Sequence, residues 1–225
     1  MTTHIELARY IDHTALKPDT TEEQIRQLCV EADELGFAAV CVMPYWVPLC
    51  SLVLDELGAS LAIATTIGFP NGSHQTVVKV AETKKAIYDG AQEIDMVINV
   101  GALRSGHRAV VMADMMAVAM SAHEHGALVK VIIETSLLND DQKRLACELA
   151  GEAGVDFVKT STGFAGGGAT VADIELMREA SPKRMQIKAS GGIRDAATAI
   201  RMIAAGASRI GTSSGVSIVR ESVDA

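Results

Sequence analysis

The sequence lacks closely paired cysteines, an export signal and an apolar run long enough to cross a membrane. Its four cysteines, at positions 29, 41, 50 and 147, form no CxxC or other close pair, which favours reduced thiols in the cytoplasm. The N-terminal residues lack the basic and apolar regions of a signal peptide. The longest apolar stretch, residues 110–120, is interrupted by Asp114 and is shorter than the roughly 20 residues of a membrane helix. We therefore expect a soluble, cytoplasmic protein with no membrane partner.

A basic surplus, nucleotide-binding motifs and a zinc helix are also missing. Asp and Glu number 28 against 20 Lys and Arg, which gives a formal net charge of −8. Because non-specific nucleic-acid binding needs clustered Lys and Arg, this balance predicts no nucleic-acid partner. No GxGxxG or Walker A pattern is present, and His123 and His125 lack the spacing of zinc ligands on a helix, so neither a nucleotide nor a metal is predicted. A small anionic ligand stays compatible, because a pocket needs only local positive potential.

Apolar residues, by contrast, are abundant. Hydrophobic residues make up 48% of the chain and charged residues 21%, which is enough for a core and unlike a disordered chain. No linker, low-complexity segment or block of charge divides the sequence. We expect residues 1–225 to form a single domain.

Short β-prone apolar runs alternate along the chain with longer segments of helical periodicity. Strands are predicted at residues 10–15, 38–43, 61–67, 94–100, 128–134, 155–160, 185–190 and 209–212. Helices are predicted at residues 21–35, 45–57, 76–89, 109–125, 140–153, 171–179 and 195–205. Asn139 is placed to cap the helix that begins at residue 140, and Thr170 with Asp173 resembles a capping box for the next helix.

The spacing of these units indicates the fold class. Successive strands recur every roughly 23 to 34 residues, as expected for parallel strands joined by helical crossovers. Almost continuously apolar strands, such as residues 129–133, suit a sheet that is covered on both faces. Eight such units predict an α/β fold, the (β/α)8 TIM barrel. An open, doubly wound sheet is the alternative, because alternation alone does not prove closure.

Three predicted strands carry a lysine among apolar neighbours: Lys130 in the fifth, Lys159 in the sixth and Lys188 in the seventh. Neighbouring strands lie about 4.8 Å apart, so Lys159 and Lys188 are expected to come close enough for one to depress the pKa of the other. A lysine that attacks a carbonyl must be neutral, and burial plus a nearby cation produce that state. Asp95 in the fourth strand can pair with a lysine and move protons during imine formation. The set predicts Schiff-base chemistry but does not decide which lysine is the nucleophile, and Lys130 could equally form a structural ion pair.

Glycine- and serine-rich loops follow the last predicted strands. Ser190-Gly191-Gly192 follows the seventh strand and Ser213-Ser214 the eighth, and both are either tight turns or backbone donors for an anion. In barrels of this class these two loops frequently hold phosphate. The glycine-rich residues 162–168, after the sixth strand, either complete that cradle or act as a lid.

The mouth of the barrel provides further candidates. Cys41 lies near the end of the second predicted strand and either lines the pocket or is a small core residue. Asp12 and His13 in the first strand either touch substrate or fill the barrel. The additional pocket residues that we expect are Asp12, Thr14, Cys41, Lys130 and Thr162.

Five segments, taken together and in order, resemble one known family. They are residues 11–16 (Ile-Asp-His-Thr-Ala-Leu), 93–97 (Glu-Ile-Asp-Met-Val), 157–163 (Phe-Val-Lys-Thr-Ser-Thr-Gly), 187–194 (Ile-Lys-Ala-Ser-Gly-Gly-Ile-Arg) and 209–215 (Arg-Ile-Gly-Thr-Ser-Ser-Gly). They resemble the deoxyribose-phosphate aldolase family over about residues 10–215. The pair of lysine motifs, Lys-Thr-Ser-Thr-Gly and Lys-Ala-Ser-Gly-Gly, is highly specific for it.

The resemblance implies a class I aldolase that reversibly cleaves 2-deoxy-D-ribose 5-phosphate to D-glyceraldehyde 3-phosphate and acetaldehyde. It implies no metal or other cofactor, a place in deoxyribonucleoside catabolism, and the homodimer that is common in the family. On this resemblance Lys159 forms the imine, Lys188 keeps Lys159 neutral and Asp95 relays protons. The phosphate-binding positions that match are Gly163, Gly191, Gly192, Gly211, Ser213 and Ser214.

Two positions depart from the family pattern. Some members have a phosphate-binding lysine directly after the Thr-Gly pair, whereas this chain has Phe164, so we expect its phosphate grip to depend more on backbone donors. No tyrosine follows Tyr88, which leaves water, Asp95 or Lys188 for the proton transfer that a C-terminal tyrosine assists in some members. The alternatives are another phosphosugar lyase or isomerase, or a phosphosugar-binding protein without activity, because a fold does not fix a function.

Overall fold

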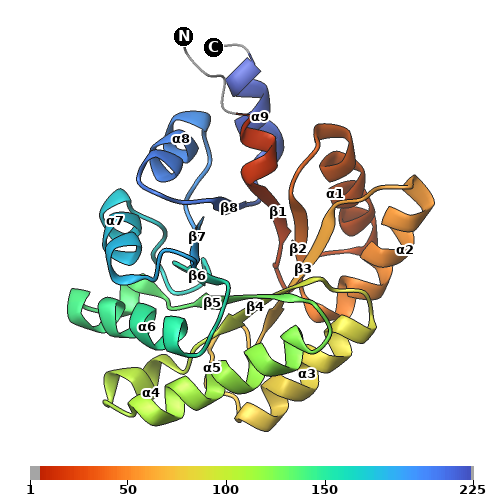
Figure 1. The fold of residues 1–225 in the computed structure, drawn as a ribbon. Coiled ribbons are helices and arrows are strands. Elements are labelled where there is room, and N and C mark those ends of the chain that lie inside the picture. The colour runs from red at the N-terminus through yellow and green to blue at the C-terminus, as the bar shows by residue number, and fades with distance from the viewer. Residues whose placement is uncertain (1–5, 224–225) are drawn as a thin grey trace.

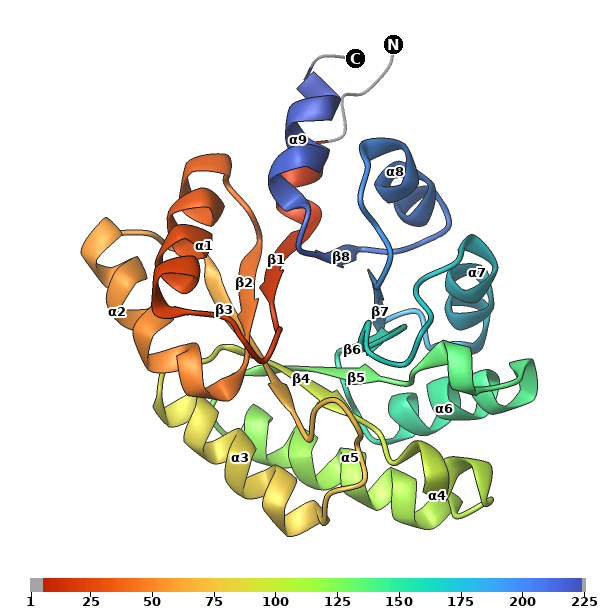
Figure 2. The same cartoon turned by 180° about the vertical axis from the view of Figure 1, so that it is seen from behind.

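The computed structural model describes residues 6–223 and arranges their strands in one closed ring (Figure 1, Figure 2). Each strand pairs in parallel with the next, and β8 pairs with β1. The strands are β1 (Ile11–Ala15), β2 (Ala39–Val42), β3 (Ala62–Ile67), β4 (Glu93–Val97), β5 (Leu128–Ile132), β6 (Phe157–Lys159), β7 (Gln186–Ser190) and β8 (Arg209–Thr212). The predicted (β/α)8 TIM barrel is confirmed, and the open sheet is excluded because the ring closes.

Helices surround the ring on its outside, as Figure 1 shows. The α-helices are α1 (Glu22–Leu35), α2 (Val47–Leu57), α3 (Thr76–Tyr88), α4 (Val100–Arg104), α5 (Arg108–His123), α6 (Asp140–Glu152), α7 (Val171–Ala180), α8 (Ala196–Ala204) and α9 (Gly215–Val223). Short 3-10 helices are η1 (Leu7–Tyr10), η2 (Pro44–Trp46) and η3 (Thr135–Leu137). Within residues 6–223, no helix combines the length and the apolarity needed to cross a membrane.

Local hydrogen bonds fix where several helices begin. Asn139 accepts a hydrogen bond from the backbone of Gln142 at the start of α6, and the Gln142 side chain accepts one in return. Thr170 accepts from the backbone N–H of Asp173 at the start of α7. Both caps were predicted from the sequence, and they satisfy donors that the first turn of a helix leaves unpaired.

The predicted fourth and fifth strands, residues 94–100 and 128–134, end later than β4 and β5 do. Ile98 and Ile133 are fully buried, but they lie just beyond the strands, in segments that lead into α4 and η3. An apolar run indicates burial and does not show where ladder pairing stops. The short helix α4 and the last helix α9 were not predicted.

The apolar core lies between the ring and the helices, and the inside of the barrel is polar. On β4, Ile94 and Met96 belong to the outer core, whereas Glu93 and Asp95 are buried charges on the opposite face. This is the alternation that a strand imposes on its side chains. Ala39, Cys41 and Ala64 on β2 and β3 form a separate small cluster, which leaves room for longer side chains from the other strands.

Candidate active site

Long charged side chains from six strands meet inside the barrel. Strand register places Asp95 beside Lys130, Lys159 beside Lys188, and Lys188 beside Arg209. Register partners on parallel strands point to the same face of the sheet, so their side chains share the interior. The set comprises three carboxylates and four cations: Asp12, Glu93 and Asp95, with Lys130, Lys159, Lys188 and Arg209.

Asp95 lies at the centre of this set. Its Oδ1 accepts a hydrogen bond from Lys130 Nζ at 2.7 Å. Its Oδ2 accepts one from Lys159 Nζ and one from Lys188 Nζ, both at 2.7 Å. Burial alone would raise the pKa of Asp95, but the three ammonium groups outweigh it and hold that pKa well below its usual range. The carboxylate therefore stays ionised.

Lys130 and Arg209 form the lower part of the cluster. Lys130 Nζ lies 2.5 Å from Glu93 Oε2, and Arg209 Nη1 lies 3.0 Å from the same carboxylate oxygen. Arg209 Nη1 also lies 2.6 Å from Asp12 Oδ1. Burial by itself would lower the pKa of Lys130, yet the nearby carboxylates, above all Asp95, raise it above its usual value. Lys130 is thus a permanent cation with structural partners.

Lys188 and Lys159 differ in the number of their partners. Lys188 donates hydrogen bonds to both Asp12 and Asp95, and these carboxylates overcome the effect of burial and raise its pKa. Lys159 has Asp95 alone, so burial and the charge of Lys188 lower the pKa of Lys159 below its usual value. Loss of one proton from the four cations would also balance the three carboxylates. Lys159 is the amine that this environment favours in the neutral form.

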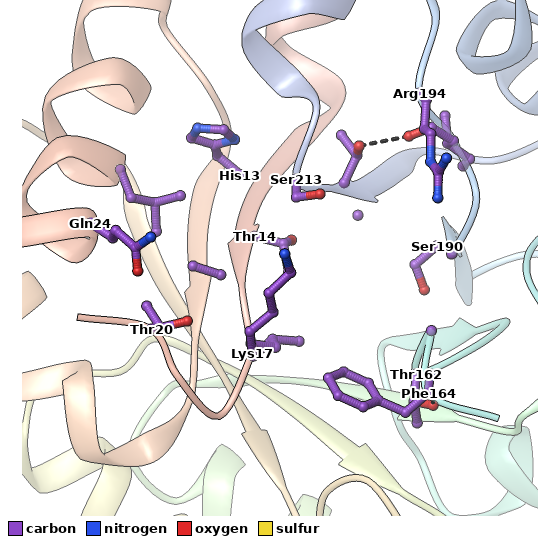
Figure 3. A pocket seen from close by; sticks show the side chains of 18 of the residues that line it. His13, Thr14, Lys17, Thr20, Gln24, Thr162, Phe164, Ser190, Arg194 and Ser213 are labelled. Atoms are coloured by element: carbon purple, nitrogen blue, oxygen red, sulfur yellow. Dashed lines mark hydrogen bonds between the residues drawn. The ribbon is translucent and has the colours of Figure 1, made fainter. Parts of the chain in front are cut away.

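A cavity of about 950 Å³ opens at the carboxyl ends of β1, β6, β7 and β8 (Figure 3). Lys159 is the member of the charged cluster that lines it, whereas Lys188 and Asp95 lie behind Lys159. Sequence reasoning alone left the choice between the two lysines open. The cavity distinguishes them, because Lys159 lines the space that a ligand can occupy and Lys188 does not.

Backbone donors from three loops converge on the same cavity. The N–H groups of Gly163, Gly191, Gly192 and Ser213 donate no hydrogen bond within residues 6–223, and all four residues line the cavity. Gly163, Gly191 and Gly192 have positive φ angles of 85°, 88° and 77°, a region that glycine enters without steric cost. Free N–H groups that face one cavity form an anion site.

Two cations that the sequence analysis did not assign also line the cavity. They are Lys17, in the loop after β1, and Arg194, after β7 (Figure 3). In the described part of the chain, no carboxylate lies within 4.0 Å of either side chain. The signal that could have found them is position, because residues just beyond barrel strands line the catalytic face.

The structure separates the predicted pocket residues into two groups. Thr14, Thr162 and Gly211 line the cavity with the residues above. Asp12, Cys41 and Lys130 do not, because their side chains are fully buried inside the barrel below it. Cys41 lies 4.0 Å from Asp95 Oδ2 through its Sγ atom, and burial raises the pKa of its thiol.

Ser214, expected to bind phosphate, also lies outside the lining of the cavity. Its backbone N–H already donates to Thr212 Oγ1 at 2.9 Å. Among residues 6–223, no group of three or more His, Cys, Asp or Glu side chains is placed to hold a metal ion.

Comparison with known proteins gives consistent matches over nearly the whole chain. A family model described as "DeoC/LacD family aldolase" matches residues 7–224. Deoxyribose-phosphate aldolase 1 of Bacillus licheniformis is 58% identical over 215 residues, which cover 96% of this chain and 95% of that protein. Deoxyribose-phosphate aldolase of Thermococcus kodakarensis is 56% identical over 219 residues, with 97% and 98% covered.

Solved structures show the same similarity. A structure described as QR15, an aldolase, superposes with a TM-score of 0.92 at 44% identity, covering 98% of this chain and 97% of its own. Deoxyribose phosphate aldolase from Aeropyrum pernix, described as tetrameric, superposes with a TM-score of 0.89 at 35% identity, covering 95% and 89% of the two chains.

Proposed function

Since the chain belongs to the DeoC/LacD family of aldolases, we propose that it catalyses the reversible cleavage of 2-deoxy-D-ribose 5-phosphate to D-glyceraldehyde 3-phosphate and acetaldehyde. The curated relatives carry the name of this activity and match almost end to end. One observation of the site carries the proposal further. Lys159 belongs to the buried charge cluster, has a lowered pKa and lines the large cavity, as a lysine nucleophile must.

Lys159 is the residue that forms the covalent intermediate. Its neutral amine attacks the C1 carbonyl of the open-chain sugar to give a carbinolamine. The carbinolamine takes up a proton and loses water, which gives a protonated imine; this proton is released again when the final imine is hydrolysed. The iminium withdraws electrons from the C2–C3 bond, which breaks as the C3 hydroxyl loses its proton. Glyceraldehyde 3-phosphate leaves, and protonation of the remaining enamine followed by hydrolysis releases acetaldehyde and the free amine.

Asp95 and Lys188 control charge and protons around that amine. Asp95 Oδ2 accepts hydrogen bonds from both lysine nitrogens at 2.7 Å, so this oxygen is placed to relay a proton to or from the Lys159 amine while Lys188 keeps its charge. The same carboxylate stabilises the positive charge that develops on the iminium. Lys188 contributes its permanent charge, which opposes protonation of Lys159.

The phosphate of the substrate binds at the backbone donors of the β6, β7 and β8 loops. Gly163, Gly191, Gly192 and Ser213 present N–H groups to the cavity, and Lys17 and Arg194 add positive charge at its wall. The aromatic ring of Phe164 packs edge-on against Phe69, with 5.3 Å between ring centroids, and contributes no charge. This arrangement supports phosphate binding through backbone N–H groups and through the two cations, Lys17 and Arg194.

We further propose that residues 1–225 act as one aldolase domain, in the cytoplasm and as a homodimer. Buried and unbonded thiols at all four cysteines support a reducing compartment. Self-association is supported by the description of the Aeropyrum pernix relative as tetrameric. Sedimentation of the purified chain measures the oligomeric state directly.

Reduction of the imine tests the mechanism. The protein is incubated with acetaldehyde and borohydride, and peptide mass spectrometry then locates the stable ethylamine. An adduct confined to Lys159 is the expected result. An adduct on Lys188 reverses the roles of the two lysines, and the absence of any selective adduct removes the Schiff-base mechanism.

Substrate profiling tests the reaction itself. Release of acetaldehyde from 2-deoxy-D-ribose 5-phosphate is the expected result. A phosphosugar isomerase would convert its substrate without releasing acetaldehyde, and a binding protein would gain thermal stability from the ligand without turnover.

A further inference from the structure

Glu134 is unusual in its backbone, its burial and its position. It is the non-glycine residue with a positive φ angle in residues 6–223, at φ 56° and ψ 68°. This left-handed conformation is costly for a residue with a Cβ and persists only where the surrounding structure enforces it. The side chain is 3% exposed, and the residue lies just after β5, at the end of the barrel that carries the cavity.

The backbone on both sides of Glu134 is bonded to β6. The Ile133 N–H donates to the carbonyl of Lys159, and the Thr135 N–H donates to the carbonyl of Thr160, both at 3.0 Å. Between these two hydrogen bonds the segment after β5 advances two residues, from Ile133 to Thr135, whereas β6 advances one, from Lys159 to Thr160. This mismatch is the pattern of a β-bulge. A bulge turns the extra side chain away from its regular direction. Regular alternation would send Glu134 into the barrel with Lys130 and Ile132.

The carboxylate of Glu134 instead holds the loop that follows β6. Its Oε2 accepts a hydrogen bond from the Thr162 N–H at 3.1 Å and a second one from the Thr162 hydroxyl. The oxygen of that hydroxyl accepts from the Phe164 N–H at 3.0 Å. The backbone donors on both sides of Gly163 are therefore occupied, and within residues 162–164 the N–H of Gly163 is the one that donates no hydrogen bond.

Close packing extends this support to the other phosphate-binding turn. A Cβ atom on Gly167 would lie 2.4 Å from Ser136 Cβ, which shows how closely η3 packs on the loop. A Cβ atom on Gly168 would lie 2.4 Å from the carbonyl oxygen of Gly191. The strained turn at Glu134 is thus connected through this loop to both sets of backbone donors.

We propose that Glu134 is a positioning residue, whose carboxylate fixes residues 162–164 so that the Gly163 N–H points at the phosphate of the substrate. It acts through Thr162, because Thr162 lines the large cavity and Glu134 does not. Glu134 lines instead a smaller cavity of about 180 Å³ on the other side of Thr162. That the ligand is the phosphate of the substrate rests on the proposed function, and the experiments below distinguish a failure of the Glu134 assignment from a failure of the proposed function.

Three substitutions separate the carboxylate from the backbone strain. Glu134→Gln keeps an oxygen that can accept both hydrogen bonds from Thr162, whereas Glu134→Ala removes both. Glu134→Gly also removes both but relieves the cost of the positive φ. Leu137→Ala is the control, because it changes the wall of the same small cavity without removing a hydrogen bond.

Calorimetric titration with inorganic phosphate tests the proposal, because it measures the Kd for phosphate without requiring turnover. We expect Glu134→Ala and Glu134→Gly to weaken phosphate binding about tenfold, as for one lost hydrogen bond to a charged group. Glu134→Gln and Leu137→Ala should bind within about threefold of the unmodified protein. Unimpaired binding by Glu134→Gly would overturn the proposal, because the residue would then serve only the backbone turn. Absence of phosphate binding by the unmodified protein would overturn it as well.

Kinetics provide the second readout. We expect the KM for 2-deoxy-D-ribose 5-phosphate to rise about tenfold in Glu134→Ala, with little change in kcat and with acetaldehyde still trapped on Lys159. The kcat/KM for unphosphorylated 2-deoxy-D-ribose should stay nearly constant. An equal loss for both sugars would contradict a role at the phosphate.

The two experiments together separate the assignment of Glu134 from the proposed function. If the unmodified protein binds phosphate but releases no acetaldehyde, the proposed function fails, while the assignment of Glu134 is still tested by the titration. Thermal unfolding of each variant verifies that it is folded.

Discussion

Lys159 and Lys188 donate hydrogen bonds to the same oxygen, Asp95 Oδ2, over equal distances of 2.7 Å, yet their pKa values shift in opposite directions. Burial disfavours the charge of both. The difference comes from Asp12, which pairs with Lys188 and not with Lys159. One additional carboxylate thus separates a lysine with a raised pKa from one with a lowered pKa, and of the two only Lys159 lines the cavity.

This relationship predicts that removing the two lysines has effects of different size on stability. In Lys159→Leu, three cations still face three carboxylates, so we expect the free energy of unfolding to change by about 1 kcal/mol or less. In Lys188→Leu, Asp12 and Asp95 each lose a buried partner, so we expect a loss of about 3–5 kcal/mol. Urea unfolding followed by circular dichroism measures both. Equal destabilisation by the two substitutions would contradict the assignment of partners.

The same pair predicts a difference in chemistry. Lys159→Leu should lower acetaldehyde release by roughly 10⁴- to 10⁶-fold, the scale seen when a covalent nucleophile is removed. It should also abolish borohydride trapping, while binding of inorganic phosphate persists because the backbone donors remain. Retro-aldol activity retained in Lys159→Leu would exclude this residue as the nucleophile.

The pH dependence of activity should report the charge of Lys188. In the proposed mechanism Lys159 attacks as the neutral amine, so we expect kcat/KM to rise as the pH increases through its lowered pKa. Lys188→Met removes a cation that lowers this pKa, so the rising limb should move to higher pH by about 1–3 units. Lys188→Arg keeps the charge and is the control, with a limb that stays near its original position. A limb that does not move in Lys188→Met would show that another group controls it.

Much of this site was predictable, because strands impose a period of two and place buried charges on one face. The sequence analysis predicted that the three strand lysines and Asp95 lie in one barrel, and the described structure brings them together. Glu93 was missed, although its position two residues before Asp95 puts it on the same face. Arg209 was missed because, as the first residue of β8, it has no apolar neighbour before it in the strand.

Other features depend on contacts between distant segments and could not be predicted from the residue pattern. That pattern left the choice between Lys159 and Lys188 open, and only the family resemblance assigned the imine to Lys159. In the structure the two lysines differ through Asp12, which is 176 residues away from Lys188 in the chain. The left-handed turn at Glu134 has no sequence signal, because a non-glycine residue with positive φ is stabilised by its tertiary contacts. The alternation of residues along a strand indicates which side chains share a face. Which charged groups pair with one another follows only from the fold.

A buried ion pair outside the barrel should contribute to stability. Lys79 on α3 and Asp114 on α5 lie 2.5 Å apart, with side chains 0% and 5% exposed. Lys79 Nζ also donates to the carbonyl of Val97, at the end of the strand that carries Asp95. We expect Lys79→Met to cost about 3–5 kcal/mol of unfolding free energy, because it leaves Asp114 buried without its partner.

The control for this prediction lies on the same helix. Lys85 pairs with Asp89, but its side chain is 68% exposed, so Lys85→Met should change stability by less than about 1 kcal/mol. The double variant Lys79→Met with Asp114→Leu should recover most of the loss, since no unpaired charge remains. A loss in the double variant as large as in Lys79→Met would point to packing instead of charge.

The contact between Gly168 and Gly191 should control phosphate affinity. An alanine Cβ at position 168 would lie 2.4 Å from the Gly191 carbonyl oxygen, a distance at which the backbone must move. The Ala169 N–H donates to that same oxygen at 3.0 Å, so the movement would reach the turn that presents the N–H groups of Gly191 and Gly192. Displacements of about 1 Å can cost up to 10²-fold in function. We therefore expect Gly168→Ala to raise the Kd for inorganic phosphate and the KM for the phosphorylated sugar by about 10- to 100-fold, while borohydride trapping of acetaldehyde on Lys159 continues.

Gly101→Ala is the control, because its Cβ would meet its nearest neighbour at an ordinary 3.5 Å. Unchanged phosphate binding in Gly168→Ala would mean that the β7 turn does not hold the phosphate.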